Sequence, residues 1–590
     1  MTILEKNIQA LLSGVNEPLG NKLLNFIQNK TCSRFNIDEN LNIYDKTHNV
    51  FMYENLEEEL NFFYQSILEK TPRYPFVCIY GIGNALLIKN LAKHYKHLFV
   101  FESEIELFIL ALSTIDLSEE LKVYKVVLFD CVAKDLEIQI AMIFDQQSIL
   151  EYLSLYEMFI SSHYYLKYYE TSILSLNELC IKSASVAIRN VDITCFLPLL
   201  THGQFLQNIP SMLESIPFQR ILSQRKNKFD NAIVVSAGPS LAKQLPLLKA
   251  CQDKAVIFCA DGALSMLEKE GIVPDYVTNL DFTDLAMKFF QNKENKTSLN
   301  ILSCATHPNV AHSLKAENCM IVLRNKALYQ RFNFNDFGYI DTGTHVSHFS
   351  YTLALALGFK NIIMIGQDLA FDEEGNSHSK GFDFGEKFSG EENIDKLKIP
   401  AYAGKGEVLT HTTWNDYRIK LEYLFACNDQ KAKFYNATEG GARINFTEEL
   451  SFKECCEKLL TKEKPKFELP KSLTKNRSDK LLVKFKEKIQ KDQENAKRFL
   501  DDALALKQIL ENILSKDFIL PLEFLEKVYQ NIENFNHSLD EDEFIQDEVL
   551  RGAFAYRGKL ISDVLKLHIK DETHFITAYI KAYHEWLLYF

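Results

Sequence analysis

Short apolar runs dominate the middle of the chain, and each is followed by a turn and a helix-type pattern. Six such runs lie between residues 216 and 450: Ala232–Val235, Ala255–Cys259, Tyr276–Thr278, Asn300–Ser303, Met320–Leu323 and Asn361–Ile365. Continuous apolar runs are typical of strands buried on both faces, as in a parallel sheet between two layers of helices. The pattern therefore predicts an α/β domain over residues 216–450.

The hydrophobic patterns before and after this region differ from its own. Residues 1–215 mix helical patterns with one strand–turn–helix–strand stretch, in which Gly81 and Gly83 form the turn and Glu102 ends the second strand. An acid about 20 residues after a glycine turn resembles half of a dinucleotide fingerprint, although the third glycine is missing. We expect an α/β domain whose Rossmann-like scaffold binds no ligand, with a working site as the alternative. From residue 451 glycine becomes rare and the periodicity is helical, which predicts an all-helical domain over residues 451–590.

Composition narrows the classes of function. The 590 residues carry 66 Lys+Arg against 79 Asp+Glu, a net charge of -13, which disfavours a nucleic-acid partner. The 12 cysteines are scattered without a CxxC pair, which favours a reduced cytoplasmic protein over a zinc site or a disulfide framework. The sequence shows neither a signal-peptide pattern nor an apolar stretch of about 18 residues, so no membrane span is expected.

Polar residues follow the first three predicted strands of the central domain. The first strand runs into Gly238, Pro239 and Ser240, a turn that opens a helix whose N–H groups can bind a phosphate. We expect Ser240 to cap that helix. Asp261 and Asn279 follow the next two strands and can hydrogen-bond a ribose or a base. A plain turn is the alternative for the first motif, and a cap or turn role is the alternative for the two polar residues. Together they predict a nucleotide crevice.

A second set of candidates lies further along the chain. A polar loop leads into a predicted helix over Phe349–Leu357, and Asp368 follows the strand after that helix. The loop is a second candidate anion cradle; its residues are Thr342, Gly343, Thr344 and His345. For His345 a simple cap or packing role is the alternative.

Two histidines are candidates for the general base. His411 stands in the polar run THTTWND before a predicted helix, where a histidine can accept a proton near neutral pH. His378 lies in the glycine-rich segment Gly375–Gly390, which together with Ala401–Glu407 is typical of a mobile lid. A helix cap is the alternative role for His411, and a solvated bystander is the alternative for His378.

Three motifs together resemble the motility-associated factor family of flagellin glycosyltransferases: GPSL after a strand, the GTHVS…LALALGFKNIIMIGQDLAF block, and NATEGGARI. The resemblance implies an α/β protein with a Rossmann-like central domain of sialyltransferase type, an α/β N-terminal domain and a helical C-terminal domain. It also implies transfer of a nonulosonic acid, such as pseudaminic or legionaminic acid, from its CMP-activated form to Ser or Thr of flagellin.

The central motifs are similar to those of bacterial sialyltransferases, and this implies roles for single residues. The Gly238 turn would hold the cytidine phosphate, Asp261 and Asn279 would stand where those enzymes carry asparagines, and the Thr342–Ser347 loop would contact the nucleotide. Asp368 would close the crevice. His411, five residues before Asp416, matches the spacing of the catalytic histidine.

The sequence also departs from those enzymes. Ala237 stands where they have an asparagine, and their phosphate-binding tyrosines have no clear counterpart near Phe371. The resemblance implies no required cofactor or metal, and the DxD pattern at residues 540–542 lies in the helical region, but Asp281 and Asp284 leave a divalent ion open. Two alternative functions remain: a pterin pyrophosphokinase, because some archaeal enzymes resemble the same domain, and a non-catalytic flagellin-binding factor.

Overall fold

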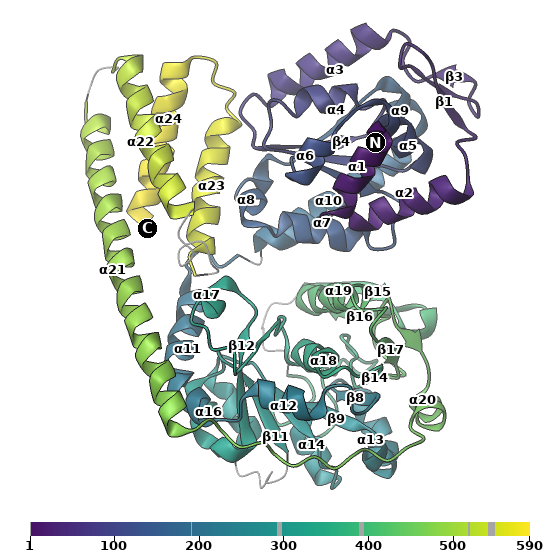
Figure 1. Cartoon of the computed structure of the whole chain (residues 1–590), viewed down its shortest axis with the longest axis vertical. Helices are drawn as coiled ribbons and strands as arrows, with labels where there is room; N and C mark the ends of the chain where they lie inside the picture. Colours follow the sequence, from purple (N-terminus) through teal and green to yellow (C-terminus); the bar gives the residue numbers. More distant parts are fainter. Residues whose placement is uncertain are drawn as a thin grey trace. The chain divides into compact units, whose positions relative to one another are not determined.

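The computed structural model describes residues 2–189, 191–291, 298–388, 395–516, 520–540 and 549–589. They form two compact units (Figure 1). The first contains the described residues of 1–195, 499–540 and 550–589, and the second contains those of 196–498 and residue 549. This grouping differs from the expected three domains, because the C-terminal helices belong to the same unit as the N-terminal sheet.

The described part of the second unit is built on a parallel sheet in the order β13-β12-β11-β10-β9-β8-β14-β17-β18. The strands are β8 (Asn231–Val235), β9 (Val256–Ala260), β10 (Tyr276–Asn279), β11 (Leu299–Ser303), β12 (Cys319–Arg324), β13 (Tyr339–Ile340), β14 (Asn361–Ile365), β17 (Lys433–Asn436) and β18 (Glu448–Glu449). All six predicted strands are present, each within one residue of its expected bounds. The α/β class is therefore confirmed.

Helices cover both faces of this sheet, as the apolar runs require. Ala232 and Val234 of β8 pack with α18 (Val346–Leu357) on one face. Ile233 and Val235 pack with α13 (Leu241–Cys251) on the other. Alternate residues of a strand point to opposite faces, so a run without polar residues fills two cores at once.

The winding of the sheet reverses beside its first strand. From β8 the chain continues through β9 to β13 on one side, whereas β14 pairs with β8 on the other. In open α/β sheets such a reversal opens a crevice at the carboxyl ends of the two strands, where ligands bind. Here the crevice lies where β8 leads into Ser236 and β14 leads into Gly366.

Beyond the sheet, a two-stranded antiparallel hairpin, β15 (Lys396–Pro400) and β16 (Glu407–His411), leads directly into α19 (Thr412–Ala426). Neither strand of this hairpin was predicted. The remaining helices of the second unit are α11 (Phe196–Glu214), α12 (Phe218–Arg225), α14 (Leu264–Lys269), α15 (Met287–Phe290), α16 (Pro308–Ser313), α17 (Ala327–Gln330) and α20 (Phe452–Leu459), with the start of α21 (Lys475–Leu514).

The first unit contains a smaller parallel sheet in the order β6-β5-β4-β7 and a three-stranded antiparallel sheet, β1-β2-β3. The strands are β1 (Phe35–Ile37), β2 (Ile43–Asp45), β3 (Val50–Phe51), β4 (Phe76–Tyr80), β5 (His97–Glu102), β6 (Val126–Asp130) and β7 (Met158–Ile160). The helices are α1 (Ile3–Leu12), α2 (Glu17–Asn29), α3 (Leu56–Lys70), α4 (Leu86–Leu91), α5 (Ile105–Thr114), α6 (Ser118–Lys122), α7 (Leu136–Phe144), α8 (Gln147–Leu150), α9 (His163–Tyr168) and α10 (Glu170–Arg189). The sequence predicted β4, α4 and β5.

A buried ion pair joins the C-terminal helices α22 (Leu522–Asp540), α23 (Arg551–Leu565) and α24 (Glu572–Tyr589) to this sheet domain. Arg557 of α23 contacts Glu151 at 2.9 Å, and both side chains are buried. Gly558, on the next position of α23, lies so close to the Glu151 carbonyl that a Cβ would overlap it. This close packing accounts for the grouping of the helices with the N-terminal sheet. No helix of the described residues is both long and apolar enough to cross a membrane.

Candidate functional site

The crevice of the second unit is bounded by two loops that hydrogen-bond to each other. Gly238 donates its N–H to the Gly366 carbonyl at 2.8 Å. The Ser236 hydroxyl donates to Oε1 of Gln367 at 2.9 Å. Gly366 has a φ of +65°, and a side chain there would overlap the Ser236 carbonyl, so glycine is required. These bonds place Asp368, the next residue along, beside the Gly238–Ser240 turn.

Asp368 occupies the start of α13. Its carboxylate accepts the Ser240 N–H at 3.2 Å and the Ser240 hydroxyl at 2.8 Å. A Cβ on Gly238 would overlap the same carboxylate, which explains the glycine. The expectation that Ser240 caps the helix is wrong, because its hydroxyl donates to Asp368 instead. Burial raises the pKa of Asp368 to about 6, against the opposing effect of the Ser240 hydrogen bonds.

The segment that contains His378 covers the same helix start. The Ser379 hydroxyl accepts the Ala242 N–H at 3.0 Å, and the Ser379 N–H donates to the Ala237 carbonyl at 2.9 Å. The chain's own oxygen atoms therefore satisfy N–H groups of α13 that were expected to face a phosphate. The phosphate-binding role of Gly238, Pro239 and Ser240 stays a prediction.

His378 itself is packed rather than solvated. Its ring stacks on Phe382 at 4.0 Å with an interplanar angle of 6°, and burial lowers its pKa to about 4. Phe382 in turn packs against Phe289. Residues 389–390 of the expected lid lie outside the described residues.

Asp261 and Asn279 meet, as the sheet order predicts for residues at neighbouring strand ends. The Asn279 amide donates to the Asp261 carboxylate, and the Gly262 N–H donates to the same carboxylate at 2.7 Å. Both side chains are buried. The Asn279 Oδ1 atom has no hydrogen-bond partner among the described residues, so the pair presents an amide oxygen that a ligand can use.

His345 is the N-cap of α18. Its Nδ1 accepts the His348 N–H at 3.3 Å, and its ring stacks on Tyr417 of α19 at 4.6 Å. Burial lowers the pKa of His345 well below its ordinary value and that of His348 to about 4. Within the described chain, Nε2 of His345 and both ring nitrogens of His348 have no hydrogen-bond partner.

The loop before α18 lies at the same edge of the sheet. Thr342 is buried, Thr344 is exposed, and Gly343 has a φ of +61° and packs against His348. The hydroxyl groups of Ser350 in α18 and Thr278 in β10 lie 2.7 Å apart. This contact fixes the start of α18 close to Asn279, so the second predicted anion site lies near the end of β10.

His411 ends β16 and caps α19. Its Nδ1 accepts the Trp414 N–H at 3.4 Å, while its buried Nε2 has no hydrogen-bond partner in the described ranges. Because Nδ1 accepts a hydrogen bond, the neutral ring carries its proton on Nε2. Burial lowers the pKa of His411 to about 4, so the ring is neutral at pH 7. As folded, His411 is a hydrogen-bond donor through Nε2.

Two hydrogen bonds attach β16 to the loop after Asp368. The Thr410 hydroxyl donates to the Leu369 carbonyl at 2.7 Å, and the Phe371 N–H donates to the Leu409 carbonyl at 2.8 Å. The start of α19 is thereby held beside the crevice.

The NATEGG segment completes this edge. Gly441, with a φ of +71°, lies against the backbone of Asp368, whose carbonyl accepts the Ala442 N–H at 2.7 Å. The Thr438 hydroxyl and the Asn436 amide nitrogen are buried without partners among the residues described. Buried polar atoms are normally hydrogen-bonded, and a group of exceptions at one sheet edge indicates a polar ligand.

The described residues contain no group of three or more His, Cys, Asp or Glu side chains that could hold a metal ion. Asp281 instead accepts the Thr283 N–H at 2.8 Å and its hydroxyl at 2.9 Å, as a turn residue does. Residues 541 and 542 of the DxD pattern lie outside the described residues. The need for a metal stays untested.

The glycine turn of the first unit is filled by its own side chains. The Ile82 N–H donates to Glu102 at 3.1 Å, and the Gly83 N–H donates to the Tyr165 hydroxyl at 3.1 Å. The Asn84 N–H donates to the Tyr53 hydroxyl at 3.3 Å. A Cβ on Gly81 would overlap the Tyr165 ring. These contacts favour a scaffold without a ligand, and burial raises the pKa of Glu102 to about 7.

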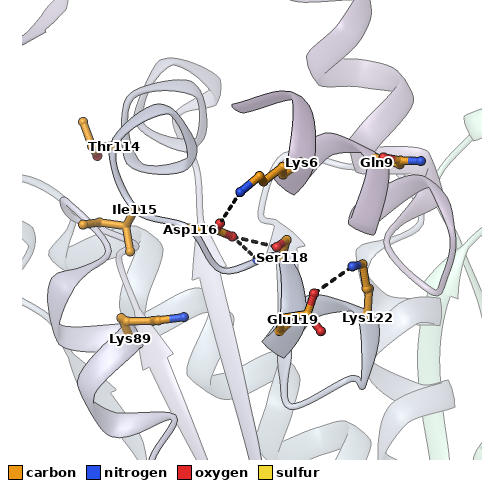
Figure 2. Close-up of a pocket in the computed structure, with 9 residues that line it drawn as sticks. All are labelled: Lys6, Gln9, Lys89, Thr114, Ile115, Asp116, Ser118, Glu119 and Lys122. Carbon is orange, nitrogen blue, oxygen red and sulfur yellow. Dashed lines mark hydrogen bonds and ion pairs between the residues drawn. The ribbon is translucent and has the colours of Figure 1, made fainter. Parts of the chain in front are cut away.

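The first unit also has an open depression of about 750 Å³ at α1, α4, α5 and α6 (Figure 2). Its three lysines all have acidic partners: Lys6 contacts Asp116 at 3.4 Å, Lys122 contacts Glu119 at 2.8 Å, and Lys89 contacts Glu120 at 2.6 Å. Each lysine of the depression therefore has an acidic partner, and nothing in its described lining indicates a ligand.

Two comparisons with known proteins found matches. Residues 203–374 match the family model described as 6-hydroxymethylpterin diphosphokinase MptE-like. No curated protein matches the chain. Among solved structures, the MAf glycosyltransferase from Magnetospirillum magneticum AMB-1 is 15% identical, with a TM-score of 0.47 over 99% of this chain and 96% of that chain. The segment that matches the MptE-like family contains the α13 and α18 starts and Asp368, and it ends before His411.

Proposed function

We propose that this chain is a cytoplasmic glycosyltransferase that moves a nonulosonic acid from its CMP-activated form to Ser or Thr of flagellin. The observation that carries the proposal is a group of buried polar atoms at the carboxyl edge of the central sheet that have no hydrogen-bond partner among the described residues. Asn279, His345, His411, Asn436 and Thr438 contribute them. The motifs that resemble the motility-associated factor family lie at the same edge.

The reaction requires a donor site and an acceptor site. The acceptor hydroxyl oxygen bonds to the anomeric carbon while the bond from that carbon to the CMP phosphate breaks, and CMP leaves with the electron pair. The proton of the hydroxyl passes to a base, for which His411 and His378 are the candidates from the sequence. With its proton on Nε2 and its Nδ1 bonded to the Trp414 N–H, His411 could act as the base only in its other tautomer. Hydrogen-bond donors stabilise the charge that develops on the leaving phosphate.

In this proposal the nucleotide occupies the crevice near Asp261 and Asn279. The loop Thr342–His345 and Asp368 lie around it, and the phosphate lies toward the helix starts. Purified full-length protein should release CMP from CMP-pseudaminic or CMP-legionaminic acid when flagellin is added, and the intact mass of flagellin should rise by the mass of the sugar. CMP release without a mass increase would indicate hydrolysis, and neither change with either donor would refute the proposal.

Binding tests the location of the donor site. Calorimetry should show tighter binding of CMP than of ATP. Gly238→Val should abolish CMP binding, because the added side chain displaces Asp368 from the crevice wall. Unchanged CMP affinity in a folded Gly238→Val variant would place the nucleotide elsewhere.

The match of residues 203–374 to the MptE-like family favours one alternative, a pterin diphosphokinase. That enzyme would transfer a diphosphate from ATP to a hydroxymethylpterin. Formation of AMP from ATP in the presence of 6-hydroxymethylpterin, without CMP release in the flagellin assay, would support this alternative. Flagellin binding without either reaction would indicate a non-catalytic binding factor.

A further inference from the structure

The start of α19 combines three features that suit an anion. The helix has 15 residues, so its first turn carries the partial positive charge of a helix dipole. His411 caps it through Nδ1 and is 2% exposed, which leaves a buried Nε2–H without a partner among the residues described. A buried donor without an acceptor indicates that a bound group supplies one.

Lys396 adds a full positive charge beside this histidine. In the β15–β16 hairpin Lys396 and His411 are paired directly across the two strands. Side chains of such a pair lie on the same face, with their Cβ atoms about 5 Å apart. Both contact one aromatic ring: the Lys396 ammonium lies 4.8 Å from the centre of Phe371, and the His411 ring lies 6.1 Å from it.

Aromatic rings lie beside the pair. Phe371 also packs on Trp414 at 4.9 Å, and Trp414 packs on His411 at 4.1 Å. Phe371 thus lies beside both the ammonium and the imidazole, and Trp414 lies beside the imidazole. An exposed ammonium and a buried neutral donor, together at a helix start, suit an oxyanion better than a sugar hydroxyl.

The start of α13 offers less room for such a group. Its N–H groups on Ser240 and Ala242 are bonded to Asp368 and Ser379, and the Asp368 carboxylate would repel a second anion when ionised. The starts of α13 and α19 are linked through the segment around Asp368. Asp368 contacts the start of α13, and the next residue, Leu369, accepts a hydrogen bond from β16, which leads into α19. A phosphate excluded from α13 therefore has a second helix start within the same crevice.

We propose that Lys396 and the Nε2–H of His411, at the start of α19, bind the phosphate of the activated donor and stabilise it as it leaves. The identity of this phosphate rests on the proposed function, whereas the anion site itself does not. Lys396 would then neutralise the charge of the phosphate. It would take the place of the phosphate-binding tyrosines of the sialyltransferases, which have no clear counterpart near Phe371.

Titration calorimetry with the full chain tests the site with CMP, cytidine and inorganic pyrophosphate as probes. Lys396→Ala should weaken CMP binding about tenfold, as expected for loss of a charge-assisted hydrogen bond, and should leave cytidine binding unchanged. Lys396→Arg should restore most of the CMP affinity. Lys405→Ala, which removes an exposed lysine at the other end of the hairpin, is the matched control and should bind CMP like the wild type.

The outcomes separate the site from the function. Wild-type CMP affinity in Lys396→Ala, or an equal loss for CMP and cytidine, would overturn the anion site. If the wild type binds neither CMP nor cytidine, the proposed function fails. Pyrophosphate then tests the anion site alone: weaker pyrophosphate binding in Lys396→Ala than in the wild type would support the anion site. If the wild type also fails to bind pyrophosphate, the anion site is refuted.

Discussion

Each unit contains a parallel sheet whose winding reverses beside its first strand, and in each a glycine turn follows that strand. In each a buried acid accepts an N–H of the turn: Glu102 accepts from Ile82, and Asp368 accepts from Ser240. The two units differ in the groups that surround the rest of the glycine turn. In the first unit the hydroxyls of Tyr165 and Tyr53 take the next N–H groups, and the Tyr165 ring fills the space above Gly81.

In the second unit the edge of the sheet retains polar atoms that nothing in the described chain satisfies. They are ring nitrogens of three histidines and amide or hydroxyl groups of Asn279, Asn436 and Thr438. At the corresponding edge of the first unit, the described residues without partners are two serine hydroxyls, Ser161 and Ser162. The comparison teaches that a glycine turn before a helix does not define a ligand site, and that unsatisfied polar groups around it are the better indicator.

The largest expected effect is a loss of sugar-transfer rate on substitution of His411 in the second unit. His411→Ala should lower the rate of sugar transfer about 10²- to 10⁴-fold, the range for a group that moves or stabilises a proton or charge in the reaction. His411→Gln keeps an N–H donor and should recover part of the rate if the histidine acts as a donor. A general base would not be replaced by glutamine.

His378→Ala is the companion variant for this measurement. The packed position of His378 on Phe382 predicts a much smaller loss of rate than His411→Ala causes. A collapse of transfer in His378→Ala alongside a wild-type rate in His411→Ala would move the catalytic histidine into the lid segment. Circular dichroism of each variant checks that the fold is retained.

The next effect tests whether the first unit is a structural scaffold. Arg557→Ala leaves the buried Glu151 carboxylate without its partner and should lower the free energy of unfolding of the first unit by about 3–5 kcal/mol. Affinity for CMP should be unchanged below the unfolding temperature. Denaturant unfolding and calorimetry measure both quantities, and a parallel loss of CMP affinity would show that the nucleotide site depends on the first unit.

The two buried acids predict different pH windows. The folded-state pKa is about 6 for Asp368, against an ordinary 3.8, and about 7 for Glu102, against 4.5. Because the folded protein binds the proton more tightly in both cases, each contributes stability that is complete at low pH and is lost as the pH rises to the folded-state pKa. Each loss is about 3 kcal/mol, since one pKa unit corresponds to about 1.4 kcal/mol.

Neutral substitutions should remove these pH dependences one at a time. Asp368→Asn should flatten the fall in unfolding free energy between about pH 4 and 6, and Glu102→Gln should flatten it between about pH 4.5 and 7. Urea unfolding across this pH range measures both. An unchanged pH profile in Asp368→Asn would mean that this carboxyl is not protonated preferentially in the folded state.

The smallest expected effect concerns the lid segment. Ser379→Ala removes the hydroxyl that accepts the Ala242 N–H and should cost about 1 kcal/mol of stability, the value for a lost helix cap. It should also open the start of α13, so CMP affinity should stay equal or rise slightly. Thermal unfolding and calorimetry measure the two effects, and a tenfold loss of CMP affinity would make Ser379 a ligand contact.

The sequence predicted the central strands well because a strand buried on both faces leaves a continuous apolar run. It also predicted that Asp261 and Asn279 meet, since carboxyl ends of parallel strands share an edge. It did not predict that Asp368 takes the Ser240 N–H, because that contact joins residues 128 positions apart. The lid contact of Ser379 was missed for the same reason.

Other features lack a local signal. The β15–β16 hairpin has exposed positions in both strands and no continuous apolar run, so neither strand was predicted. Without it Lys396 could not be paired with His411. The position of His411 before a helix was evident from the sequence, but the proton on Nε2 follows from the hydrogen bond to Trp414 and required the structure.

Hydrogen exchange of the full-length protein, followed by mass spectrometry with and without CMP, tests the central claim most directly. CMP should slow amide exchange in the segments around Asp368, His411 and Thr438, and it should leave the Gly81–Gly83 turn and the Tyr165 region unchanged. Protection around Gly81 and Tyr165, with none at the edge of the central sheet, would contradict the account and place the nucleotide in the first unit.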